Sequence, residues 1–65
     1  MPEPITEALM QRATATAREV IARLSEAQGY LEQHETLAAL GTLSGLDERL
    51  RYIETLLTIS RDLKL

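Results

Sequence analysis

The chain has 65 residues, no cysteine, one histidine and a formal net charge of −3 at pH 7. These features exclude disulfides, thiolate zinc sites and a metal held by histidines alone, and the acidic balance counts against general binding to nucleic acid. Because a single core of this size contributes only about 3–5 kcal/mol of stability, we expect another chain to stabilise the fold.

The first predicted helix covers residues 6–40, after a lead in which Pro2 and Pro4 disfavour helical backbone. Small and apolar side chains recur along it in steps of three and four for more than three heptads, which is typical of a coiled-coil seam. The members of this predicted seam are Ala13, Ala17, Val20, Leu24, Ala27, Leu31, His34 and Ala38. Leu9 extends it toward the N-terminus, and Ile21, Tyr30 and Leu37 widen it.

The strongest turn signal is the segment 41–45, which begins and ends with glycine. Gly41 suits the left-handed position that ends many helices. We therefore predict that the chain turns at residues 41–45 and that a second helix covers residues 46–63. A break at residues 33–36 would give helices of more equal length and stays open as the alternative.

The second predicted helix carries its apolar residues at Leu46, Leu50, Ile53 and Leu57. Steps of four, three and four place these side chains on one face of an α-helix, whereas strict alternation would indicate a strand. A helix with such a stripe buries it against another element. The sequence therefore predicts an all-α fold, a single antiparallel two-helix hairpin that a second chain, identical or different, completes to a helical bundle.

The unequal lengths of the two predicted helices point to an interface. At 1.5 Å per residue the helices would be roughly 50 Å and 28 Å long, so the second would cover only part of the first. The apolar face left uncovered would mark a contact with another protein chain. The predicted interface residues are Leu9, Ala13, Ala17, Val20, Leu24, Leu31, Leu46, Leu50, Ile53 and Leu57.

No catalytic, cofactor or metal site is predicted. His34 is the only histidine, and no motif places a nucleophile beside it. Glu26, Glu32 and Glu35 form an acidic stretch, but two short helices do not readily enclose a pocket around it. We therefore expect a protein that is not an enzyme and binds no small-molecule substrate, cofactor or metal.

The order of residues in the second predicted helix resembles a known family, the small helical co-chaperones of type III secretion needle subunits. The matching positions of the C-terminal helix are Leu46, Leu50, Arg51, Ile53, Glu54, Leu57 and Ile59. Those that align with the family's first helix are Val20, Ala22, Leu24, Glu26 and Leu31. The glycine-containing turn is longer than in that family and differs in composition.

This resemblance implies a cytoplasmic helical hairpin that binds a larger tetratricopeptide-like co-chaperone. The pair would keep the needle subunit soluble before export. A cytoplasmic location also agrees with an N-terminus that lacks the basic start and apolar core of a signal peptide. No apolar run is long enough to span a membrane.

Two functions remain open. In the first, the chain is an adaptor or chaperone subunit that offers an apolar helix face to a different protein. In the second, it is a homodimeric four-helix-bundle regulator or inhibitor of plasmid or phage type, which binds RNA or a host protein. For RNA, the dimer would have to assemble a basic patch, since Arg49 and Arg51 point about 200° apart on a helix.

Overall fold

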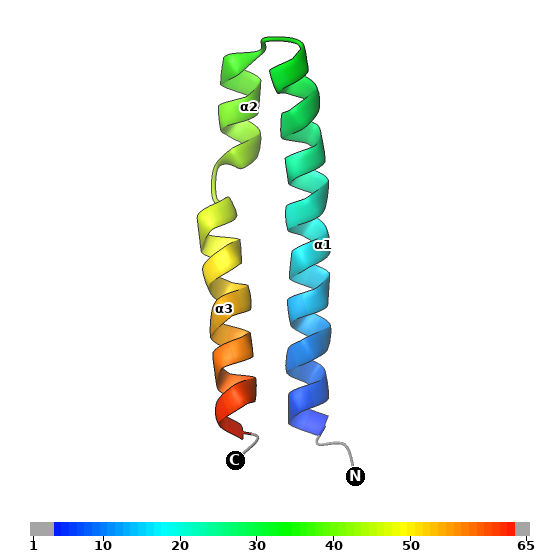
Figure 1. Ribbon diagram of the computed structural model, residues 1–65, viewed down its shortest axis with the longest axis vertical. Coiled ribbons are helices and arrows are strands. Elements are labelled where there is room, and N and C mark those ends of the chain that lie inside the picture. The colour runs from blue at the N-terminus through cyan, green and yellow to red at the C-terminus, as the bar shows by residue number, and fades with distance from the viewer. Residues whose placement is uncertain (1–3, 64–65) are drawn as a thin grey trace.

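The computed structural model describes residues 4–63, which form three helices. Helix α1 spans Pro4–Glu32, α2 spans Thr36–Leu43 and α3 spans Leu46–Leu63. The short α2 and the longer α3 follow one another in a column that runs antiparallel to α1 (Figure 1). Since the described residues contain no strand, the predicted all-α hairpin is confirmed. The hairpin is elongated, with Cα extents of 50 × 16 × 11 Å.

The hairpin turns at residues 33–35, so the preferred turn at 41–45 was wrong and the alternative break was correct. The predicted helix over residues 6–40 ends early, at Glu32. Residues 36–40 belong instead to α2, on the other side of the turn.

The early turn depends on His34, whose φ of 60° is the left-handed conformation that the sequence analysis assigned to Gly41. The N–H of His34 donates to the carbonyl oxygen of Leu31 at 3.1 Å. The N–H of Glu35 donates to the carbonyl oxygen of Tyr30 at 2.8 Å. These two bonds form a Schellman motif, which ends a helix by satisfying carbonyl groups of its last turn. Histidine tolerates this backbone better than β-branched residues do.

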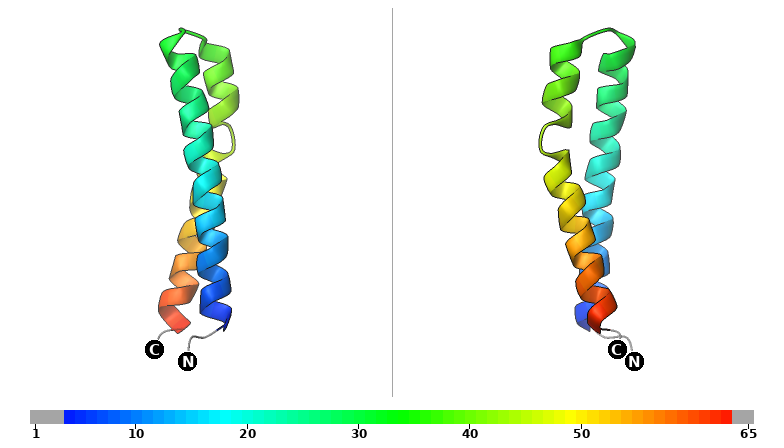
Figure 2. Two further views of the ribbon diagram at one scale, coloured as in Figure 1. Left: turned by 90° about the vertical axis from the view of Figure 1, so that its right-hand side faces the viewer. Right: turned by 60° about the vertical axis from the view of Figure 1, so that its left-hand side comes forward.

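The segment predicted as the turn is a local break between α2 and α3. The N–H of Ser44 lies 3.0 Å from the carbonyl oxygen of Leu40 and 3.3 Å from that of Gly41, which closes α2. Gly45 then adopts a φ of 83°, and α3 continues along the same side of α1 (Figure 2). Gly41 lies inside α2, so in this segment the left-handed conformation belongs to Gly45.

The early turn also changes which part of α1 is covered. Together α2 and α3 lie along most of α1 (Figure 1). The expectation that the N-terminal half of the first helix would be uncovered was therefore wrong. Ala13 and Val20, which were expected to be exposed in a single chain, are only 7% and 6% exposed. The length mismatch that suggested an interface is therefore absent from the described chain.

The two sides of the hairpin meet along a seam in which steps of three and four alternate, as in a coiled coil. On α1 the buried and half-buried seam residues are Thr6, Leu9, Ala13, Thr16, Val20, Arg23, Ala27 and Tyr30. On the α2–α3 column they are Ala39, Thr42, Leu46, Arg49, Ile53, Leu56 and Ser60. Many of these side chains are small or polar, and no large side chain in residues 5–63 is completely enclosed. The core is consequently thin.

We expect alanine to have opposite effects at two glycines of the α2–α3 column. At Gly41 an added Cβ would meet no atom within 4 Å, so Gly41→Ala should raise the free energy of unfolding by about 0.5–1 kcal/mol. At Gly45 the φ of 83° is unfavourable for any residue with a Cβ, so Gly45→Ala should lower the free energy of unfolding by about 1–2 kcal/mol. Urea unfolding of both variants measures these changes. A less stable Gly41→Ala variant would contradict the placement of Gly41 inside a helix.

Candidate functional site

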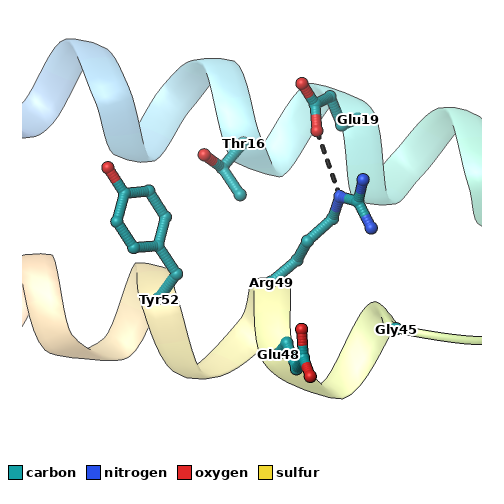
Figure 3. Close-up of a pocket in the computed structure, with 6 residues that line it drawn as sticks. All are labelled: Thr16, Glu19, Gly45, Glu48, Arg49 and Tyr52. Carbon is teal, nitrogen blue, oxygen red and sulfur yellow. Dashed lines mark hydrogen bonds and ion pairs between the residues drawn. The ribbon is translucent and has the colours of Figure 1, made fainter.

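One side of the seam carries polar groups. Arg49 of α3 and Glu19 of α1 form an ion pair there, with 3.1 Å between Nε and Oε2. Thr16, Glu19, Gly45, Glu48, Arg49 and Tyr52 line a shallow depression of about 390 Å³ around this pair (Figure 3). We call this side the polar flank.

The charge of the depression on the polar flank does not suit an anionic ligand. Arg49 is the one cation that lines the depression, and Glu19 already pairs with it. Glu48 brings a second carboxylate, so the lining has a net negative charge. The side chain of Glu19 is 63% exposed, so the pair stabilises the hairpin by about 1 kcal/mol at most. The pair therefore serves mainly to join α1 to α3 at this level.

The opposite side of the seam is apolar, and helical geometry shows how it forms. On each helix the residue that follows Thr16, Arg23, Arg49 or Leu56 lies just beside the seam. Because α1 and the α2–α3 column are antiparallel, the residues that follow these seam positions lie on the same side of the seam in both. We call the resulting surface the apolar flank. Its members are Met10, Ala17, Ile21, Leu24 and Leu31 of α1, Leu40 and Leu43 of α2, and Leu50 and Leu57 of α3.

The apolar flank holds most of the large apolar side chains that the described chain exposes. Seven of the twelve belong to it, and 37% to 63% of each is exposed. These seven are Ile21, Leu24, Leu31, Leu40, Leu43, Leu50 and Leu57. The other five are dispersed over the polar flank, the outer surface of α2 and the end of α3. A contiguous apolar surface of this kind usually marks a binding site.

The ten predicted interface residues fall into two groups. Five lie in the seam, where the chain's own packing buries or half-buries them: Leu9, Ala13, Val20, Leu46 and Ile53. The other five lie on the apolar flank: Ala17, Leu24, Leu31, Leu50 and Leu57. The predicted stripe of α3 is thus divided, because Leu56 and Ser60 face α1 while Leu50 and Leu57 do not.

Four members of the apolar flank are absent from the ten predicted interface residues: Met10, Ile21, Leu40 and Leu43. The signal that could have identified Leu43 was its spacing of seven residues from Leu50, which is itself seven residues from Leu57. Sequence reasoning also missed Ser60, which is 3% exposed and whose Oγ has no hydrogen-bond partner within residues 4–63. A buried hydroxyl of this kind costs about 1–3 kcal/mol, so apolarity alone could not have selected it.

Other kinds of site have no support in the described residues. Nowhere in residues 4–63 do three or more histidine, aspartate or glutamate side chains form a group that could bind a metal ion. The described helices also include none with the length and apolar character needed to cross a bilayer. No protein-family model, curated protein or solved structure matches this chain.

Neighbouring leucines of α3 provide a test of this geometry. Leu56 is 5% exposed in the seam, so Leu56→Ala should lower the free energy of unfolding by about 2–4 kcal/mol. Leu57 is 48% exposed on the apolar flank, so Leu57→Ala should lower it by about 1 kcal/mol in dilute protein. Urea unfolding at low protein concentration measures both changes. Equal losses, or a larger loss for Leu57→Ala, would show that the helix is rotated from the position described.

Proposed function

We propose that this chain is a non-enzymatic protein–protein interaction module and that its apolar flank packs against helices of another protein chain. The observation that supports this proposal is the concentration of seven large, exposed apolar side chains on one side of the seam. Leu43, Leu50 and Leu57 recur every seven residues, which is the spacing of a face that packs in helical bundles.

The energy available from the apolar flank agrees with reversible binding. A leucine that passes from half exposed to buried contributes on the order of 1 kcal/mol. The cost of association is estimated at about 4–15 kcal/mol. The combined contribution of seven such side chains is comparable with the lower part of that range. Substitutions on the flank would therefore readily abolish binding of the module to its partner.

The thin seam gives an independent reason for a partner. Half of its six buried apolar members are alanines: Ala13, Ala27 and Ala39. A hairpin with few large buried side chains is marginally stable alone, because small cores barely offset the conformational entropy of the chain. A partner on the apolar flank would place a second apolar layer beside the seam and stabilise the fold by mass action.

The resemblance to needle co-chaperones adds a specific form of this proposal. In that form the partner is a larger tetratricopeptide-like co-chaperone, and binding takes place in the cytoplasm. Leu24, Leu31, Leu50 and Leu57 are positions of the resemblance that lie on the apolar flank. They are the side chains that such a partner would contact.

Site-specific photo-cross-linking tests the proposed module. A benzophenone amino acid at Leu24 should form adducts with a protein chain in the cells that make this protein, because Leu24 is 49% exposed on the apolar flank. The adducts should map to a helical segment of that chain and should disappear when Leu50→Asp is added. The control carries the same probe at Thr55, an exposed residue of α3 outside the flank. Equal adducts from both sites, or none from Leu24, would refute the proposal.

A further inference from the structure

We infer that the apolar flank binds a second copy of this chain, turned end for end, so that two hairpins form an antiparallel four-helix bundle. This inference rests on the proposed function and names its partner. Three observations support it: the area of the broad face, the uneven charge along the hairpin and the spacing of the flank residues.

The broad face of the hairpin is as large as one side of a stable dimer interface. It measures 50 by 16 Å between Cα atoms, which corresponds to a projected area of about 800 Å². Stable interfaces bury about 800 Å² on each partner. One further hairpin of the same length would extend over the whole flank.

The charge of the hairpin is divided along its long axis. The half nearest the turn, residues 19–48, carries six carboxylates and one arginine. In the other half, residues 4–18 and 49–63 carry five arginines and three carboxylates. The two halves thus have formal charges of −5 and +2.

This division favours the antiparallel arrangement over the parallel one. A second copy turned end for end places each acidic half beside the basic half of the other copy. A parallel copy would place two acidic halves together. Charges near the interface that lie within about 10 Å of each other, the Debye length at 0.1 M salt, interact between the copies, whereas those on the far side of each hairpin are screened. The surface is therefore complementary to itself when one copy is reversed.

The seven-residue spacing of the flank gives the antiparallel dimer a register. Ala17 and Leu50 lie near the middle of the hairpin, so the twofold axis passes beside them. Leu57 of one copy then lies opposite Leu43 of the second copy, because each is seven residues from Leu50. Met10 and Leu24 are likewise each seven residues from Ala17 and meet in the same way. Apolar layers consequently face apolar layers.

Sedimentation equilibrium of the purified chain, with helicity measured in parallel, tests the dimer. We expect a dimer whose dissociation constant rises by about 100-fold or more in Leu50→Glu, since each copy would bury an unpaired carboxylate at the twofold axis. Thr55→Glu adds the same charge to an exposed site of α3 outside the flank and should leave the dimer unchanged. A native chain that remains monomeric, or a dimer that Leu50→Glu does not weaken, would overturn the inference.

Disulfide cross-linking tests the orientation and does not depend on a destabilised variant. The sequence contains no cysteine, so single introduced cysteines report one contact each. A mixture of Leu43→Cys and Leu57→Cys chains should form the mixed disulfide on oxidation. A mixture of Met10→Cys and Leu57→Cys chains should not, because those residues would lie roughly 21 Å apart along the bundle at 1.5 Å per residue. The reverse result would show a parallel dimer and overturn the proposed arrangement.

These results separate the inference from the proposed function. If the chain is a monomer and the Leu24 probe still forms flank-dependent adducts with a different protein, the dimer is refuted and the interaction module is supported. A dimer that is insensitive to Leu50→Glu, together with no adducts from Leu24, would remove both.

Discussion

The small side chains of the seam determine where the other residues of the hairpin can lie. Ala13 and Ala27 on α1, and Ala39 on α2, are buried where the two sides meet. Small residues allow close approach of helices, and a densely packed interior leaves little room at their level for larger side chains. Most leucines therefore lie beside the seam and remain partly exposed, whereas Leu46 and Leu56 are buried in it. The same constraint thus produces both the thin core and the apolar flank.

The two flanks differ because polar and apolar residues occupy equivalent positions on opposite sides of the seam. On the polar flank, Glu19 reaches across to Arg49, and the pair satisfies its charges within the chain. On the apolar flank, Leu24 and Leu50 remain about half exposed with no such partner described for them. An ion pair is complete in one chain, whereas exposed leucines gain stability only when another apolar surface covers them. This difference makes the apolar flank the functional candidate.

The fold class could be predicted from the sequence, but the turn and the rotation of α3 could not. Steps of three and four identify helices wherever they occur. The turn depends on the left-handed backbone of His34, a conformation that a histidine signals far less strongly than a glycine does. The rotation depends on Arg49 and Ser60 facing the seam in place of Leu50 and Leu57. An arginine can bury its aliphatic stem and keep its charge in water, so polarity alone does not exclude it from a seam.

The position of the chain ends has a mechanical consequence. Both ends of the described chain lie at one end of the hairpin, opposite the turn at residues 33–35 (Figure 1). A force that pulls these ends apart would therefore load the seam one layer at a time, beginning at Thr6 and Ser60. Unzipping of this kind needs less force than shearing two helices along their length, where all layers resist together. The hairpin would thus separate easily under tension, whereas a chain bound across both helices would hold it closed.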